Sequence, residues 1–272
     1  MAKLSLCKVV CALSLVNSIS LSNSIATSYG ETNRTEIIDK LDAKVGVEKG
    51  VSYNSKSLEK KLKDCVEEFG EGIIAQLAFQ GGYLLEFLKE KPSVPYLEIE
   101  LVKGEKGTKY ACGILDKKDV LVTKEIMEKE LSKYLYAILV GSLDDLQKEE
   151  SQNKKDIRVN TKINDNFVRF EVGYTVKSNN ELTLYKSSFT KDVNIRLGIM
   201  HNWAKKLVTN ELKDDEWIDI TAMLDGINGV EGITTEIYPM KEGGKNWFGY
   251  FVKDEKSLMG KDPITFCFFA QQ

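Results

Sequence analysis

Residues 168–176 read VRFEVGYTV, in which an apolar residue occupies every second position. A period of two puts the apolar side chains on one face of a strand and the polar or small side chains on the other. The pair Asn179-Asn180 follows as a turn signal, and strand-forming residues resume in 182–185, LTLY. This stretch therefore predicts two strands in succession.

Short stretches of the same kind occur on both sides of it. Alternation recurs in residues 96–101, YLEIEL, and further strand-forming runs lie at 120–122, 135–140, 233–237, 250–252 and 263–269. Many short strands separated by turn residues are typical of an all-β sandwich or barrel. No internal repeat accompanies them. The sequence therefore predicts an all-β fold over most of the chain.

The region before these strands has a different period. In residues 57–69, apolar side chains recur at three- and four-residue spacing after Ser57, a residue type favoured at helix N-caps. A second apolar set, residues 73–79, precedes Gly81-Gly82. The spacing predicts a helical segment. It either packs on the domain that follows or serves as a pro-segment or partner-binding helix.

The composition narrows the chemistry. Of 272 residues, 42% are hydrophobic and 29% are charged, and the formal net charge is -3. The chain therefore lacks the basic surface of a protein that binds nucleic acid or an anionic membrane, and we expect neither partner. His201 is the only histidine and no CxxC pair is present, so we expect no metal site and no cofactor. We interpret His201 as a packed or surface residue rather than a catalytic base.

The N-terminus has the pattern of a secretory signal. Lys3 and Lys8 flank a short apolar stretch, and Ser24 and Ala26 are small residues of the kind that signal peptidase accepts. Polar residues interrupt the apolar run, which is too short for a membrane span. We therefore interpret residues 1–26 as a cleaved signal peptide rather than an uncleaved anchor, and expect a soluble, secreted protein. Residues 27–52 are polar without sustained periodicity and read as a lead segment.

Secretion bears on the cysteines and on glycosylation. Cys7 and Cys11 leave with the signal peptide. The mature chain keeps three cysteines, Cys65, Cys112 and Cys267. Three thiols allow at most one intramolecular disulfide, and their pairing stays open. The sequon at Asn33 predicts a glycosylation site near an exposed N-terminus.

Several segments follow one another in a notable order: VPYLEIEL at 94–101, ACGIL at 111–115, VLVTKEIM at 120–127, ILVGSLD at 138–144, and ELTLYKSS at 181–188. In order and spacing they resemble strands of the chymotrypsin-like (trypsin-like) secreted serine proteases, including the segment that carries the catalytic histidine. The resemblance implies a double β-barrel over residues 80–272, preceded by the polar and helical segment 27–79. It is much weaker beyond residue 200. Residues 207–217 read as helix or loop, which leaves the completeness of the second barrel open.

The resemblance also implies where a protease would carry its catalytic residues. The histidine position falls on Ile126, the aspartate position on Glu181, or on Asn180 if the alignment slips by one, and the nucleophile position on Asn246. Every role is vacant or altered, so the resemblance implies an inactive homologue. Residues 78–82, AFQGG, resemble the activation junction but lack a basic residue for tryptic cleavage.

No other group in the sequence offers a clear replacement site. The acidic cluster at residues 214–216 reads as a solvated turn, and the Cys112 thiol has no histidine near it in sequence. The expected function is that of a secreted, non-catalytic serine protease homologue that binds a protein partner, as a cascade cofactor, as a decoy or in host or immune contacts. Two alternatives stay open. One is a secreted β-rich effector or carrier unrelated to proteases, and the other is an active hydrolase with a relocated site.

Overall fold

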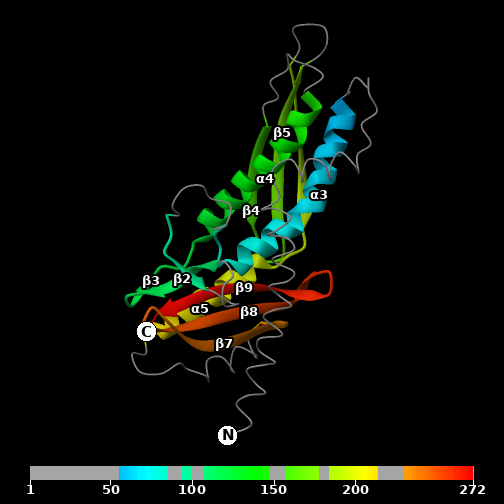
Figure 1. The fold of residues 1–272 in the computed structure, drawn as a ribbon. Coiled ribbons are helices and arrows are strands. Elements are labelled where there is room, and N and C mark those ends of the chain that lie inside the picture. Colours follow the sequence, from blue (N-terminus) through cyan, green and yellow to red (C-terminus); the bar gives the residue numbers. More distant parts are fainter. Residues whose placement is uncertain are drawn as a thin grey trace. The chain divides into compact units, whose positions relative to one another are not determined.

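The computed structural model describes residues 55–84, 93–99, 107–147, 157–177, 184–213 and 230–271 (Figure 1). These ranges all belong to one compact unit, Gly50–Gln272. They form two β-sheets and three helices, so the fold is rich in β-structure but is not all-β. Several predicted features lie outside the described residues: the signal peptide, the polar lead segment, Asn33, Asn180, Glu181 and the acidic cluster at 214–216.

Helix α3 (Ser55–Phe79) confirms the helix predicted from the spacing of its apolar residues. It packs closely on the smaller sheet at Gly70, where a Cβ would lie 3.4 Å from side-chain atoms of both Phe170 and Val193. Leu62 and Phe170 belong to the same buried cluster. The helix therefore shares a core with the strands that follow it in the chain.

The end of α3 is a Schellman motif, a helix cap built on glycine. Gly81 and Gly82 have φ angles of 79° and 93°, and their N–H groups donate to Ala78 O at 3.1 Å and to Leu77 O at 2.8 Å. Glycine adopts this left-handed backbone at no steric cost. The segment that resembles an activation junction is thus the cap of a helix, and backbone geometry explains its two glycines.

Strands β4 (Ile157–Ile163), β5 (Val168–Lys177) and β6 (Leu184–Val193) form the smaller, antiparallel sheet. The strands predicted at 168–176 and 182–185 are confirmed where they are described. The alternate apolar side chains of β5 are buried wherever the structure describes them: Val168, Phe170, Val172 and Tyr174. They face the helices α3 and α4, which cover one side of this sheet (Figure 1).

Two strand predictions are wrong. Residues 135–140 lie inside helix α4 (Lys124–Gln147), and residues 120–122 lie in the loop before it. Four side chains at four-residue spacing are completely buried along one side of it: Met127, Leu131, Leu135 and Leu139. Tyr136, on another side, is 45% exposed. A six-residue apolar run cannot by itself distinguish such a helix from a buried strand.

The larger sheet has the strand order β1-β2-β9-β8-β7, with β3 paired to β2. Its strands are β1 (Tyr96–Ile99), β2 (Thr108–Leu115), β3 (Lys118–Asp119), β7 (Ile233–Glu242), β8 (Lys245–Met259) and β9 (Asp262–Gln271). Strands β2 and β9 are parallel and the other pairs are antiparallel. The strand predictions at 96–101, 233–237, 250–252 and 263–269 are confirmed where described.

Helix α5 (Leu197–Glu211) packs on one face of the larger sheet (Figure 1), where Trp203 Nε1 donates to Thr235 Oγ1 of β7 at 3.0 Å. Within the described residues neither sheet closes on itself, since β1 and β7 end the larger sheet and β4 and β6 end the smaller. The chymotrypsin-like double β-barrel is therefore not confirmed. The all-β prediction is wrong at α4 and α5, because helices rather than a second layer of strands bury the apolar sheet faces.

Candidate functional site

The described residues do not assemble the site that the protease resemblance implies. Ile126 lies in the first turn of α4 and packs against the core, and its N–H donates to Thr123 Oγ1 at 3.4 Å. Asn246 is exposed in the β7–β8 hairpin, opposite Lys241. One position thus belongs to a helix and the other to a hairpin, and neither side chain is an acid, a base or a nucleophile.

Of the three cysteines expected in the mature chain, Cys112 and Cys267 are free thiols. Cys112 on β2 and Cys267 on β9 are buried, whereas Cys65 on α3 is partly exposed. Burial raises the pKa of the Cys112 thiol to about 12 and raises that of Cys267 well above its ordinary value. A thiol must lose its proton to act as a nucleophile, so both buried cysteines are inert at neutral pH.

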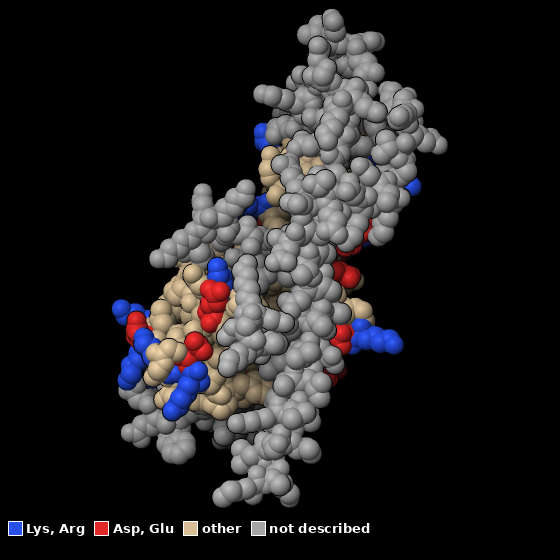
Figure 2. All heavy atoms as spheres, viewed as in Figure 1, with Lys and Arg blue, Asp and Glu red and all other residues tan. Residues whose placement is uncertain are grey.

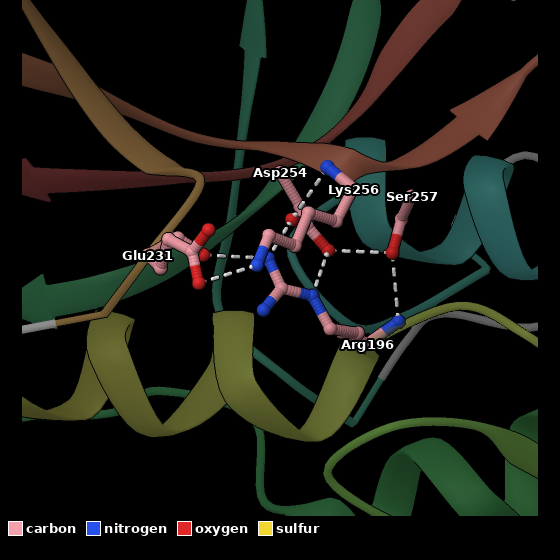
Figure 3. Close-up of polar contacts among 5 residues, drawn as sticks. All are labelled: Arg196, Glu231, Asp254, Lys256 and Ser257. Atoms are coloured by element: carbon pink, nitrogen blue, oxygen red, sulfur yellow. Dashed lines mark hydrogen bonds and ion pairs between the residues drawn. The ribbon is translucent and has the colours of Figure 1, made fainter.

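A buried ionic cluster joins the start of α5 to strand β8 (Figure 3). Asp254 is completely buried, and Arg196 donates to both of its carboxylate oxygens, from Nε at 3.0 Å and from Nη2. Ser257 Oγ donates to Asp254 Oδ2 at 2.5 Å and accepts the Arg196 N–H at 2.9 Å. The backbone N–H of Lys256 donates to the same carboxylate at 3.0 Å.

The position of this cluster indicates a structural role. The pairing of β8 with β9 shifts register between Asp254 and Leu258, and the bonds to Asp254 hold the backbone through that irregularity. Ser257 is completely buried, so its hydroxyl is closed to a substrate. Contact between a serine and an aspartate therefore does not make a relocated hydrolase site here.

The outer face of the smaller sheet is a polar surface with a groove. Every second residue of each strand points away from the core, and the pairing of the strands aligns these residues in rows. The rows are Arg158, Gly173 and Ser188, then Asn160, Glu171 and Thr190, then Lys162, Arg169 and Asp192. The groove, of about 490 Å³, is lined by the first two rows together with Val159, Val172 and Phe189.

The groove exists because the central strand lacks a side chain near its middle. Gly173 lies on β5 between Arg158 and Ser188. Among the described residues, a Cβ built on it would meet one atom within 4 Å, the Arg158 Cβ at 4.0 Å. An isolated glycine inside a strand often marks a place where another group approaches closely. The described neighbours of Gly173 leave that place open.

Hydrogen bonds hold polar side chains beside this groove. Asn160 Nδ2 donates to Glu171 Oε2 at 2.8 Å, and Arg169 donates to both oxygens of Asp192 at 2.7 and 2.8 Å. The hydrogen-bonded guanidinium of Arg169 lowers the pKa of Asp192, which keeps this pair charged. Side chains that are already held in place lose little conformational freedom when a partner binds.

Charges of both signs are mixed over the described surface. Figure 2 shows Lys and Arg side chains beside Asp and Glu side chains on the face in view, rather than a patch of one sign. The outer face follows the same rule, since its Arg169 and Lys162 pair with Asp192 and Glu128. Recognition at this face would therefore rest on hydrogen bonds and shape more than on net charge.

The sequence analysis predicted neither the buried ionic cluster nor the groove over Gly173. Arg196 and Asp254 lie 58 residues apart, and no spacing rule connects them. Gly173 carries a signal that could have identified the groove, because the two residues before it on the same face of VRFEVGYTV, Arg169 and Glu171, are large and charged.

Two more kinds of site concern the described part of the chain, a metal site and a membrane-spanning helix. Among those residues, no three His, Cys, Asp or Glu side chains gather as a metal ion would require. None of the described helices is both long enough and apolar enough to cross a membrane. The expectations of no metal and no membrane partner stay predictions. Comparison with protein-family models, with curated proteins and with solved structures finds no match for this chain.

Proposed function

We propose that this protein is a secreted, non-catalytic binding protein that holds a protein partner on the outer face of its three-stranded sheet. The observation that carries the proposal is the groove over Gly173, an open hollow in a polar sheet whose neighbouring side chains are already hydrogen-bonded. Secretion rests on the signal-peptide pattern of residues 1–26.

The chemistry of this face favours a protein over an apolar small molecule. Sites for small molecules enclose most of the ligand within largely apolar walls. This groove is instead open, and polar residues from three neighbouring strands border it, Arg158, Asn160, Glu171, Ser188 and Thr190. Protein interfaces are about as polar as the rest of a protein surface, and they use about one hydrogen bond per 100–200 Å².

Burial of the reactive side chains supports a binding role over catalysis. His201 is 8% exposed and Ser257 is completely buried. Cys112 and Cys267 are buried thiols with raised pKa values. Each of these candidate bases and nucleophiles is thus shielded from a substrate, which is why we prefer binding to a relocated hydrolase site.

Between the two binding hypotheses, the open sheets favour an effector or carrier unrelated to proteases. A protease homologue would present two barrels that face each other across a cleft, and the described strands supply two open sheets instead. A single closed barrel around an apolar cavity, the geometry expected of a carrier for apolar ligands, is equally unlike the described sheets. A secreted effector that binds a protein is the form of the proposal that this geometry supports best.

Filling the groove tests the proposal. Gly173→Tyr places a large side chain in the middle of β5, and Thr234→Tyr places the same side chain at an exposed position of β7 as a matched control. In parallel preparations, a photo-crosslinking residue replaces Thr190 or Thr234, and each protein is incubated with the medium into which the protein is secreted. A partner captured at Thr190 alone is then purified and titrated against the wild type and both tyrosine variants.

We expect Gly173→Tyr to lower the affinity for this partner by about tenfold or more, the effect of changing a residue at the centre of an interface. Thr234→Tyr should leave the affinity unchanged. Equal capture at both positions, or equal affinity of all three proteins, would contradict the proposed binding face. Turnover of a peptide or ester substrate, together with covalent labelling by a serine-reactive phosphonate, would overturn the non-catalytic role.

A further inference from the structure

His201 lies in an enclosed position where α5 meets both the larger sheet and the segment that leads into α4. Its side chain is 8% exposed, and its ring packs edge-on against Phe266 of β9, with centroids 6.0 Å apart. The ring Nε2 lies 2.7 Å from Val122 O. A carbonyl oxygen can only accept a hydrogen bond, so Nε2 carries the proton and donates it to Val122.

The other ring nitrogen is then a buried acceptor. His201 Nδ1 has no hydrogen-bond partner among the described residues. A proton added there would create a second donor that faces no acceptor, inside an apolar environment where an unpaired charge is costly. The neutral ring therefore fits this place, and the charged ring does not.

The groups around the ring shift its pKa in both directions, and burial has the largest effect. Burial lowers the pKa of His201 below 6.5, and Lys124 of α4 and Lys205 of α5 lower it further, while the Val122 carbonyl and Glu125 of α4 raise it. Lys205 is itself paired with Asp119 of β3. From β9, the described contact with the ring is the apolar side of Phe266.

The contact with Val122 links separate parts of the fold. Leu121 and Val122 are 6% and 2% exposed, and they lie in the segment that runs from β3 into α4. Helix α4 covers the smaller sheet, and α5 packs on the larger one (Figure 1). The contact between His201 and Val122 belongs to no strand pairing, so its loss would loosen the start of α4 from α5 and leave both sheets paired.

We propose that His201 is an acid-sensitive latch: when Nδ1 takes up a proton below neutral pH, the ring leaves its pocket to become hydrated, and the contact between α5 and residues 120–123 opens while both sheets stay paired. No covalent bond forms or breaks in this step. The closed form holds the neutral ring, so the latch is fully closed above pH 6.5 and loosens progressively as the pH falls below that value.

Because the chain has one histidine, its titration can be followed without mutagenesis. In an NMR titration of the full protein carrying no histidine tag, the single imidazole signal should have its midpoint below 6.5, and at neutral pH its proton should reside on Nε2. Lys124→Gln removes one of the two lysines and should move the midpoint upward. A wild-type midpoint at or above 6.5, or a neutral ring protonated on Nδ1, would overturn the proposal.

Hydrogen exchange tests the opening itself. Between pH 7.5 and 5.5, after correction for the intrinsic rate, exchange in residues 119–127 should rise by up to about tenfold, the ratio that linkage to an ordinary histidine allows. Residues 247–253 of β8 should not change, and His201→Gln, which keeps a donor but does not titrate, should abolish the rise. Equal pH dependence in wild type and variant would overturn the latch. If His201→Gln does not fold, the comparison of wild type with Lys124→Gln decides, because the latch requires both midpoint and opening to shift together.

Discussion

Replacing Asp254 with alanine tests whether the buried ionic cluster at the start of α5 stabilises the fold. Asp254 accepts hydrogen bonds from the Arg196 guanidinium at both oxygens, from Ser257 and from the Lys256 backbone. Its side chain is completely buried, and that of Arg196 is 14% exposed. Asp254→Ala therefore leaves a largely buried guanidinium without its counter-charge.

Breaking a buried pair by removing one partner costs about 3–5 kcal/mol, because the remaining charge stays out of water. We expect about 3–4 kcal/mol here, since Arg196 keeps one acceptor, Glu231 O at 3.1 Å, and is not wholly enclosed. Asp192→Ala is the matched control. Asp192 makes the same two-bond contact with Arg169, but these side chains are 39% and 41% exposed, and exposed pairs contribute about 0–1 kcal/mol.

Urea unfolding followed by tryptophan fluorescence measures both losses, because Trp203 and Trp247 are buried in the native state. A loss below about 1 kcal/mol for Asp254→Ala, or equal losses in the two variants, would refute the reasoning. If Asp254→Ala fails to fold, the double variant Arg196→Met/Asp254→Leu gives the answer. It removes both charges and should be more stable than the single variant, since no unpaired charge remains.

Two further predictions concern a backbone position and the thiols. Gly81→Ala should lower the free energy of unfolding by more than about 2 kcal/mol, because φ is 79° and a Cβ would lie 2.7 Å from Cys267 O. Gly243→Ala is the control: its φ is 57° but no described atom lies within 4 Å of the added Cβ, so it should cost about 1 kcal/mol in the same urea titration. In a protein prepared without residues 1–26, unfolding in urea should expose two further thiols to DTNB, as counted by absorbance, because Cys112 and Cys267 are buried in the native state. An equal number of reactive thiols in the native and the unfolded protein would contradict this burial.

The strands are predictable from the sequence wherever one side of a sheet is buried and the other faces water. In residues 168–176 the period of two is plain, because α3 and α4 bury Phe170 and Val172 while Arg169 and Glu171 lie on the outer face. The same reasoning finds β1 from the alternation in residues 96–99. A strand buried on one side needs apolar residues at every second position, and this alternation is visible in the sequence.

Helix α4 is not predictable from its most apolar six residues. In residues 135–140 both the buried and the exposed sides are apolar or aromatic, since Leu135 and Leu139 face the core while Tyr136 and Ala137 are exposed. A window of six therefore has no visible period. The spacing of four becomes clear when Met127 and Leu131 are included, which extends the window to the length of a helix.

The pairing of the strands, the buried ionic cluster and the groove over Gly173 could not be predicted from the sequence. The parallel pairing of β2 with β9 joins segments near residues 112 and 269, and no local pattern specifies which strand another will meet. Two of the five segments that resemble protease strands are not strands: 138–144 lies inside α4, and 120–127 runs from a loop into the same helix. Short apolar segments fit several architectures, so their order in the chain does not determine the fold.

The binding face and the latch depend on different contacts, so the two proposals are separable. The start of α5 is fixed at Arg196 by β8 and at Gly198 by the β4–β5 turn, where a Cβ would lie 2.5 Å from Asn164 O. The outer face lies on the opposite side of its sheet from α3 and α4, and the β4–β5–β6 pairing sets its shape. Proton uptake at His201 should therefore leave the groove over Gly173 intact, and Gly173→Tyr should leave the histidine titration unchanged. If instead either change altered both properties, the two sheets would have to respond as one cooperative body, and the position of α5 between Arg196 and His201 would be the physical link.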